Sequence, residues 1–222
     1  INELGIKNIF LATGSSWRKD GVGRSRRKPV QGLESLQVLT PEEAIKQSPN
    51  LSGPIVVYDD EQGYLAGVIA DHLSFDEHEV IFITPASVVS PWTESTLEQK
   101  RIQKALLVSG VNVICNKTID KAEGSNLNLK CVFTGEISLL KCSSLVMVTE
   151  RIPNTKLYDQ LVEQENNTEQ GEAKHIQLIG DAESPGLIAD AVFLGHLAAQ
   201  SFEEPEQEIQ KAMFMREMPS LK

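Results

Sequence analysis

The sequence lacks several features that would assign it to a specialised class of protein. No apolar run is long enough to cross a bilayer, and the net charge of −10 disfavours binding to nucleic acid or to an anionic membrane. The three cysteines, Cys115, Cys131 and Cys142, are widely spaced and contain no Cys-x-x-Cys pair, which argues against a disulfide framework, an iron–sulfur cluster or a zinc site. Such thiols are typical of a reducing compartment, so a cytoplasmic location is expected. The 222 residues leave room for one large domain or two small ones.

A strand–helix–strand unit is the clearest pattern that the sequence contains. A β-branched and aromatic run at 55–58 is typical of a buried strand, and apolar residues recur at helical spacing over 65–73. A second buried run follows at 80–83, so that the whole unit fits into about thirty residues. This spacing predicts the βαβ unit of a dinucleotide-binding fold.

The turn between that first strand and the helix has few glycines where a phosphate would bind. It reads Asp59-Asp60-Glu61, with only Gly63 and Gly67 nearby. Glycines let the backbone approach a pyrophosphate at a helix N-terminus, whereas three carboxylates repel it. The sequence therefore predicts a dinucleotide-binding fold that does not bind a dinucleotide. The three acidic residues are expected in a solvent-exposed turn. The alternative is an acidic metal site, but no histidine or further carboxylate is spaced to complete one.

Further elements extend this unit to a small domain over residues 48–148. An amphipathic helix is predicted over 93–109, with Gly110 just beyond its end. Between 117 and 140 the hydrophobic period changes to two, which predicts a three-stranded antiparallel meander. One more buried strand follows at 145–148.

A glycine-rich basic loop lies between Trp17 and Pro29, where six side chains are Lys or Arg. Because long charged side chains prefer water, a solvated loop is the simpler interpretation. The alternative is a docking surface for an anion or an electron acceptor on an otherwise acidic protein. Trp17 and, farther along, Trp92 are expected to be packing residues and not electron relays.

Two short motifs outside residues 48–148 each follow directly after a strand-like run. One strand-like run ends in Ala12-Thr13-Gly14, and another ends in Gly180-Asp181 ahead of an apolar helix. Each motif is thus a turn that directly follows a strand. The two segments are interpreted as halves of one nucleotide domain of the flavin type, which the domain at 48–148 interrupts.

Four segments carry a resemblance to a known family: Ala-Thr-Gly-Ser-Ser-Trp at 12–17, Asp-Gly-Val-Gly-Arg at 20–24, Val-Val-Tyr-Asp-Asp at 56–60 and Ile-Gly-Asp-Ala-Glu-Ser-Pro-Gly at 179–186. The chain resembles, over nearly its whole length, the glutathione-reductase-like region of the trimethylamine, dimethylamine and histamine dehydrogenases and the related 2,4-dienoyl-CoA reductases. The Tyr-Asp-Asp turn and Ser-Pro-Trp-Thr at 90–93 resemble the histamine dehydrogenases most.

The resemblance implies a longer parent protein. Members of the family begin with a (β/α)₈ barrel that carries FMN, a 4Fe-4S cluster and the amine-oxidising residues. Because the sequence starts at Ile1, enters a strand almost at once and has no initiator Met or signal peptide, it is expected to be the C-terminal region of such a protein. The implied partners are the barrel domain of the same polypeptide, an electron-transfer partner and further copies in a homo-oligomeric parent.

The expected fold class is therefore α/β, in two domains. Residues 1–47 and 149–222 would form a discontinuous, partial FAD- or ADP-binding-like domain whose upstream βαβ unit is missing. Residues 48–148 would form the inserted NAD(P)-binding-like domain, Rossmann-like, with a degenerate phosphate loop and the antiparallel meander.

Five site residues are carried over from the resemblance. Gly180 and Asp181 match the family's Gly-Asp, whose carboxylate and adjacent helix N-terminus face the sugar and pyrophosphate of ADP or FAD. Ala12, Thr13 and Gly14 match the turn that passes the same nucleotide. Two simpler roles stay open, because Asp181 could cap the last helix and the other three residues could form an ordinary strand-ending turn. No catalytic residue or metal ligand is predicted, and the fragment alone is expected to hold no cofactor.

Three functions compete for the chain. The first is an accessory nucleotide-binding-like region of a flavin-dependent amine dehydrogenase, and the second is a flavin oxidoreductase domain that accepts NADH or NADPH. The acidic turn argues against the second, as does Thr84-Pro85, where an NAD site would have Asp or Glu and an NADP site Arg. The third is a structural or interaction module, which the absence of an intact phosphate loop favours.

Overall fold

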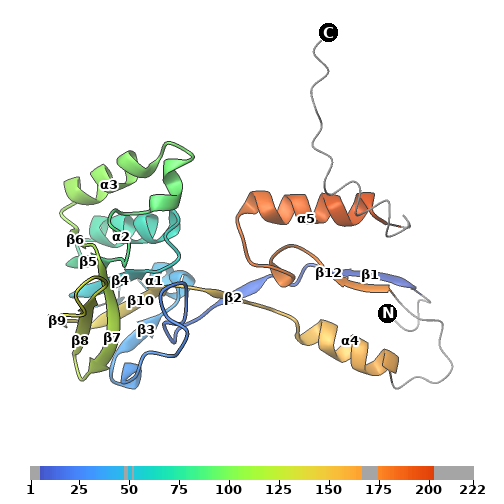
Figure 1. The fold of residues 1–222 in the computed structure, drawn as a ribbon, viewed down its shortest axis with the longest axis horizontal. Coiled ribbons are helices and arrows are strands. Elements are labelled where there is room, and N and C mark those ends of the chain that lie inside the picture. Colours follow the sequence, from blue (N-terminus) through green and yellow to red (C-terminus); the bar gives the residue numbers. More distant parts are fainter. Residues whose placement is uncertain (1–5, 48–49, 52, 167–174, 203–222) are drawn as a thin grey trace, which may run out of the picture. The chain divides into compact units, whose positions relative to one another are not determined.

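The computed structural model describes residues 6–47, 50–51, 53–166 and 175–202 (Figure 1). The chain divides into two compact units, which are described separately: unit 1 comprises residues 1–16 and 152–222, and unit 2 comprises residues 17–151. Where the chain passes between them, β2 (Ser15–Trp17) pairs with β11 (Arg151–Pro153). No helix in the described part of the chain is long and apolar enough to cross a membrane.

Unit 2 is built on a parallel sheet of five strands. In spatial order these are β3 (Gln37–Leu39), β10 (Ser144–Val148), β4 (Ile55–Asp59), β5 (Val80–Ile83) and β6 (Asn112–Ile114). The neighbouring strands pair in parallel, with Ile55 opposite both Ser144 and Val80. The strands predicted at 55–58, 80–83 and 145–148 are therefore confirmed. Because β4 is central, its side chains are buried on both faces.

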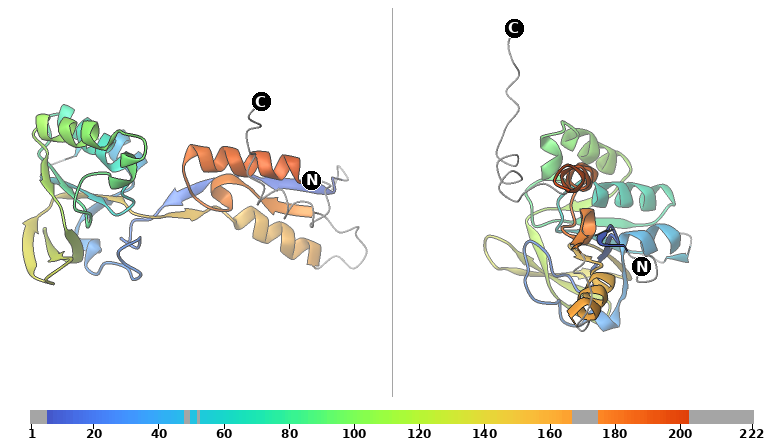
Figure 2. Two further views of the ribbon diagram at one scale, coloured as in Figure 1. Left: turned by 45° about the horizontal axis from the view of Figure 1, so that its top comes forward. Right: turned by 90° about the vertical axis from the view of Figure 1, so that its right-hand side faces the viewer.

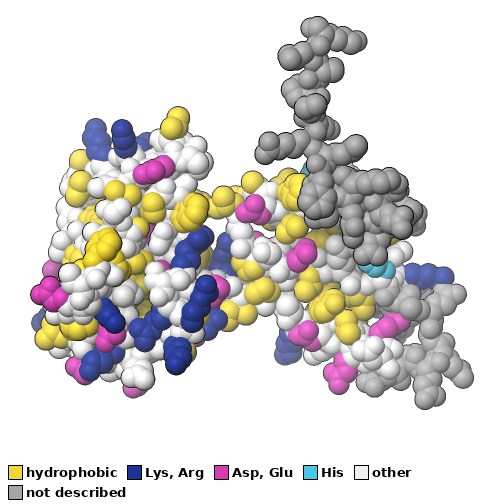
Figure 3. Space-filling view, viewed as in Figure 1, with side chains coloured by type: hydrophobic (Ala, Val, Ile, Leu, Met, Phe, Trp, Pro, Cys, Tyr) yellow, Lys and Arg dark blue, Asp and Glu magenta, His cyan; other side chains and the backbone are white. Residues whose placement is uncertain are grey.

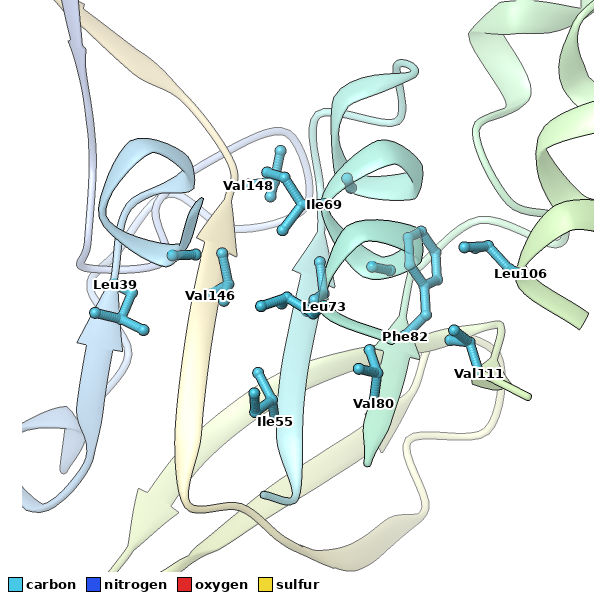
Figure 4. Packing of buried hydrophobic residues seen from close by; sticks show 14 of the residues in the cluster. Leu39, Ile55, Ile69, Leu73, Val80, Phe82, Leu106, Val111, Val146 and Val148 are labelled. Carbon is cyan, nitrogen blue, oxygen red and sulfur yellow. The ribbon is translucent and has the colours of Figure 1, made fainter. Parts of the chain in front are cut away.

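Helices cover one face of this sheet. They are α1 (Pro41–Gln47), α2 (Leu65–Phe75) and α3 (Gln99–Val108), with the 3-10 turn η4 (Pro91–Glu94). The 3-10 turn η2 (Leu33–Ser35) lies on the opposite side, where Leu33 packs into the core beneath the meander. Alternate sheet residues meet the apolar sides of the helices in one core, which Figure 4 shows from close by. Its largest side chains include Ile55, Ile69, Leu73, Phe82 and Leu106, all fully buried.

The antiparallel meander covers the opposite face. It consists of β7 (Lys117–Glu123), β8 (Asn126–Cys131) and β9 (Ile137–Lys141), in that spatial order. The other set of alternating sheet residues packs against it, so that unit 2 has helices, sheet and meander in three layers (Figure 2). The predicted α/β fold, with a Rossmann-like parallel sheet and a three-stranded meander, is confirmed.

The helix predicted over 93–109 is wrong over residues 93–98, about its first third. The turn η4 ends instead in a Schellman-type arrangement at Leu97, whose φ of 62° is left-handed and whose side chain is 90% exposed. The regular helix α3 begins only at Gln99. At its other end Gly110, with a φ of 79°, follows the C-cap as predicted.

Unit 1 contains a parallel pair of strands between two helices. β1 (Asn8–Leu11) pairs with β12 (His175–Leu178), and η5 (Gly180–Ala182) follows directly. α4 (Lys156–Asn166) covers one face through Tyr158 and Leu161, which pack against apolar side chains of both strands. α5 (Ile188–Gln200) follows η5 and lies on the other side in Figures 1 and 2. The polar composition of residues 163–174 predicts an exposed loop, and the segment from Glu203 reads as an acidic tail; residues 167–174 and 203–222 lie outside the described residues.

The boundary between the two units differs from the predicted one. The sequence assigned residues 17–47 to the same domain as the C-terminal segment, whereas the structure groups them with unit 2. The reason is that β3 pairs in parallel with β10, and that Ala44 of α1 is fully buried in the core of unit 2. α1 itself begins with the capping box of Thr40 and Glu43, in which each backbone N–H donates to the other side chain, at 2.9 and 3.2 Å.

Candidate functional site

The five predicted site residues lie at one edge of the unit 1 sheet. Ala12, Thr13 and Gly14 follow β1, while Gly180 and Asp181 follow β12. Because these two strands are adjacent and parallel, with Leu11 opposite Leu178, both turns leave the sheet at its carboxyl edge. Open α/β sheets bind their ligands outside the carboxyl ends of their strands.

Asp181 holds the two turns together. Its Oδ2 accepts a hydrogen bond from the Ser15 hydroxyl at 3.1 Å, and its Oδ1 accepts one from the backbone N–H of Gly186 at 3.2 Å. Gly180, with a φ of 59°, gives the chain the left-handed turn that presents this carboxylate. A carboxylate accepts hydrogen bonds through both of its oxygens, so it is a group to which a sugar hydroxyl can donate.

The alternative role of Asp181 as the N-cap of the last helix is wrong. The helix begins at Ile188, and Leu187 occupies the N-cap position. The carboxylate that serves this helix end is that of Asp190, which accepts the Leu187 backbone N–H at 2.7 Å. Asp181 instead bonds the chain at Gly186, before the helix starts.

Asn154 fixes the other turn, a role that the sequence did not indicate. Its backbone N–H donates to the Gly14 carbonyl at 2.9 Å, and its side-chain amide donates to the Thr13 carbonyl at 3.1 Å. The Thr13 hydroxyl in turn donates to the Asn154 carbonyl at 2.6 Å. Gly14 has a φ of 73° and open space around its Cα, so its glycine serves the backbone turn alone. The only sequence signal was the Pro-Asn pair of a connector.

A hollow of about 630 Å³ opens at the start of α4, beside Asn154. Its walls include Thr155, Lys156, Asp159 and Glu163, and none of the five predicted residues lines it. This hollow and the predicted nucleotide edge are therefore separate features of unit 1. Among those residues, no group of three or more His, Cys, Asp or Glu side chains is arranged to hold a metal ion.

The acidic turn of unit 2 is not solvent-exposed, contrary to the prediction. Asp59 and Asp60 are both 0% exposed. Asp59 Oδ1 accepts the Gln62 backbone N–H at 2.7 Å, and Asp60 Oδ2 accepts the Ser25 backbone N–H at 2.9 Å. The covering segment comes from the basic loop, which the sequence pattern could not place over this turn.

Backbone donors of the acidic turn are already used within the protein. The N–H groups of Asp60 and Glu61 both donate to the Val148 carbonyl, at 2.9 and 3.0 Å, and that of Gln62 donates to Asp59. In a phosphate-binding turn such groups point at the ligand. Here a carbonyl and a carboxylate of the chain take them.

Burial dominates the electrostatics of this turn. It raises the pKa of Asp59 well above its usual range, although the Gln62 N–H and the positive charge of Arg24 act in the opposite direction. It also raises the pKa of Asp60, against the effect of Ser25 and Arg24. Both shifts favour a neutral carboxyl group.

The basic loop is not simply solvated either. Gly21, Val22 and Gly23 are buried, and the Arg26 guanidinium donates to the carbonyls of Ile119 and Asp120 at 3.0 and 2.9 Å. The Lys19 ammonium donates to Glu43 of α1 at 2.7 Å.

Four cations of the loop are exposed: Lys19, which is paired with Glu43, and Arg24, Arg27 and Lys28. Figure 3 shows Lys and Arg side chains gathered over this part of unit 2. A docking role for this surface stays a prediction.

The two tryptophans have different surroundings. Trp17 packs against the helix-side core of unit 2, with the Arg151 guanidinium 5.2 Å from its ring centroid. Trp92 is 59% exposed, and Arg24 lies over its ring at 5.0 Å. The prediction of a packing residue is confirmed for Trp17 and wrong for Trp92. Thr84, the position of an NAD-ribose acid, is fully buried, and its hydroxyl accepts the Ala86 N–H at 3.2 Å.

No protein-family model matches the chain. Dimethylamine dehydrogenase of Hyphomicrobium sp. (strain x) is 26% identical to it over an alignment of 231 positions, which covers 95% of this chain and 31% of that protein. The solved structure of histamine dehydrogenase from Rhizobium sp. 4-9 superposes with a TM-score of 0.86 at 33% identity, over 91% of this chain and 32% of that one. The chain is homologous to dimethylamine and histamine dehydrogenase. The resemblance seen in the sequence is thereby confirmed.

Other solved structures widen the comparison for this amine dehydrogenase homologue. The 6-hydroxypseudooxynicotine amine oxidase of Pseudomonas geniculata N1 gives a TM-score of 0.82 at 28% identity, over 90% of this chain and 30% of that one. Thioredoxin reductase of T. acidophilum shares the fold alone, with a TM-score of 0.57 at 17% identity over 92% of this chain and 65% of that one. The chain spans about a third of the length of its amine dehydrogenase homologues.

Proposed function

We propose that the chain is the C-terminal, nucleotide-binding-like region of a longer flavin-dependent oxidoreductase, an amine dehydrogenase, and that it carries no catalytic residue of its own. The observation that supports this most is the joining of the two predicted motifs at one sheet edge, through the hydrogen bond between Ser15 and Asp181. Homology to dimethylamine and histamine dehydrogenase over 90% or more of the chain supports the family of the parent protein.

Unit 1 would hold ADP or FAD in the intact parent. The nucleotide would lie outside the carboxyl ends of β1 and β12, with its sugar hydroxyls toward Asp181. The carboxylate repels a pyrophosphate, so the phosphates would bind elsewhere, to the upstream βαβ unit that the proposal assigns to the rest of the polypeptide. In this proposal the FMN and 4Fe-4S groups, the barrel domain and the amine site all belong to that remainder.

Unit 2 would hold no NADH or NADPH. The N–H groups of its β4–α2 turn are taken by Val148 and Asp59, and the acidic side chains beneath are covered by the chain itself. This supports a nucleotide-free unit over the alternative of a pyridine-nucleotide acceptor. A titration of the protein with NADH should show no saturable change in fluorescence that depends on unit 2.

Asp181→Ala in the full-length parent tests the proposal. Loss of one hydrogen bond to a charged group should weaken nucleotide retention by roughly 1.5–3 kcal/mol, which is about ten- to a hundredfold. Asp190→Ala is the matched control, because the Asp190 carboxylate accepts the Leu187 N–H at the N-terminal end of α5. This substitution should cost about 1 kcal/mol of stability and leave the nucleotide content unchanged. The two readouts are bound nucleotide after dialysis and melting temperature.

The outcomes separate the competing functions. Reduced nucleotide content in Asp181→Ala alone supports the accessory nucleotide domain. A parent that holds no ADP or FAD in any variant would favour a structural or interaction module. Saturable NADH binding that disappears when the acidic turn of unit 2 is altered would favour the pyridine-nucleotide acceptor.

A further inference from the structure

The acidic turn of unit 2 contains buried carboxylate oxygens that lack donors. Asp59 Oδ2, Asp60 Oδ1 and Glu61 Oε2 are each inaccessible and have no hydrogen-bond partner among the described residues. The hydroxyl oxygens of Ser90 and Thr149 are likewise buried and have no hydrogen-bond partner among the described residues. A buried, unpaired carboxylate carries a large desolvation cost, which protonation removes.

Few charges face this cluster. Within the turn the three carboxyl groups repel one another, and from the loop Arg24 is the cation that acts on both Asp59 and Asp60. From β4, the Tyr58 hydroxyl is buried beside them, bonds to Thr118 at 2.9 Å and is also influenced by Arg26. One Arg next to three carboxyl groups leaves an excess of negative charge if all three are ionised.

The cover over the cluster is a short piece of backbone. The Ser25 N–H donates to Asp60 Oδ2, and Gly23 approaches the same oxygen so closely that a Cβ built on it would lie at 2.5 Å. Between them, Arg24 extends to the exposed ring of Trp92. A backbone turn with the Gly23 N–H donating to the Arg26 carbonyl at 2.9 Å gives the segment its shape.

We propose that the segment Gly23–Ser25 is a proton-dependent latch, which is closed over the β4–α2 turn while Asp59 and Asp60 together hold at least one proton and opens when that proton is released to solvent. Opening admits water to the carboxylates, so the ionised form favours the open state and the protonated form favours the closed one. No covalent or redox step is involved, and the latch does not depend on which nucleotide unit 1 binds.

The protection factor of the Ser25 amide against hydrogen exchange tests the latch. This quantity is the exchange rate relative to an unstructured amide, so it already corrects for base catalysis. If one proton leaves on opening, the protection factor should fall about tenfold for each pH unit between the usual range of an aspartate and the range of the closed state. The amide of Val57, inside β4, reports opening of the whole unit and should stay better protected than that of Ser25 at every pH, which shows that Ser25 exchanges through the local opening.

Single variants identify the proton. Asp59→Asn and Asp60→Asn each remove one titrating group while keeping an acceptor for the neighbouring N–H, and each should flatten the pH dependence at Ser25. Glu94→Gln is the control, because Glu94 is an exposed carboxylate of the adjacent η4 and should leave the dependence unchanged.

A direct spectroscopic measurement covers the case in which a variant does not fold. In the wild-type protein near neutral pH, the infrared C=O stretch of a protonated carboxyl group should be visible and should shift when aspartate is labelled with carbon-13. Absence of that band overturns the proposal. So does a Ser25 protection factor that does not change with pH, or one whose pH dependence survives in both Asp variants.

Discussion

Two turns of this protein have similar positions in the fold and opposite surroundings. Gly180-Asp181 follows β12 in unit 1, and in unit 2 Asp59 is the last residue of β4 and Asp60 follows it; both pairs lie at the carboxyl end of a parallel strand. Asp181 is half-buried and is bonded to Ser15, whereas Asp59 and Asp60 are completely enclosed. A carboxylate at the end of a strand can thus be a candidate ligand group, as in unit 1, or a buried acid, as in unit 2. The difference depends on whether another segment of the chain covers it.

The glycines of the two regions show the same difference. Gly14 and Gly180 have positive φ values and ordinary or open space around them, so they serve a backbone turn. Gly23 has no such φ and is needed because the Asp60 carboxylate leaves no room for a Cβ. Glycine in unit 1 bends the chain, and glycine in unit 2 lets a loop close over an acid.

The largest expected effect comes from removing a large side chain from the core of unit 2. Phe82 of β5 is fully buried in the helix-side core, and Phe82→Ala should cost unit 2 about 3–5 kcal/mol. Phe75→Ala is the control, since Phe75 is 86% exposed on α2 and its loss should stay within about 0.5 kcal/mol. Denaturant unfolding measures both. Equal loss of amide protection in β1 and β12 would contradict separate units.

Gly23→Ala sharpens the comparison of the glycines. The added methyl collides with Asp60 Oδ2, so overpacking should cost about 1–3 kcal/mol and move the Ser25 amide resonance. Gly14→Ala meets no atom within 4 Å and should cost about 1–2 kcal/mol through its left-handed φ alone, with the Ser25 resonance unchanged. If both variants move Ser25 alike, the close approach at Gly23 has no special role.

The stability of unit 2 should depend on pH. A carboxyl group whose pKa is raised by folding contributes stability that is present below its unfolded pKa and is lost as the pH rises toward its folded pKa. Since burial raises the pKa of Asp59 and Asp60, the unfolding free energy of unit 2 should fall above about pH 4, by up to about 1.4 kcal/mol per pH unit for one group. Urea unfolding of Asp59→Asn should show a smaller slope, and an unchanged slope would exclude Asp59.

The smallest effect concerns the bond that joins the two motifs of unit 1. Ser15→Ala removes the hydroxyl that donates to Asp181 and should cost about 1 kcal/mol in unit 1. Ser16→Ala is the matched control on the same strand, because the Ser16 hydroxyl bonds to the Asn154 side chain and not to Asp181. Thermal unfolding of both variants, with nucleotide content measured in the full-length parent, shows whether only Ser15 affects the nucleotide edge.

Local patterns predicted most of the fold, because hydrophobic period and capping residues act over a few positions. The βαβ unit, the meander and the helix end at Gly110 all belong to this kind. The long helix failed at Leu97, where a left-handed residue that is not glycine gave no signal. The β3 strand was missed because three residues are too few to show a period.

The sequence located the predicted site residues but not their environments. It could place Gly180 and Asp181 after a strand, yet it gave no indication that Asn154 or Ser15 would bond to the two turns. Asp59 and Asp60 were predicted to be solvated because acidic residues usually are. The segment that buries them is distant in the sequence, since Ser25 lies 35 residues before Asp60. The two turns differ in burial and in hydrogen-bond partners because different distant segments of the chain contact them.

Hydrogen exchange of the full-length parent, with and without ADP, tests most directly whether unit 1 and not unit 2 retains a nucleotide contact. Peptides that cover residues 12–15 and 180–187 should gain protection when ADP is added to the nucleotide-stripped protein, while the peptide over 59–64 should not change. Protection gained at 59–64, with none at the edge formed by β1 and β12, would contradict this assignment.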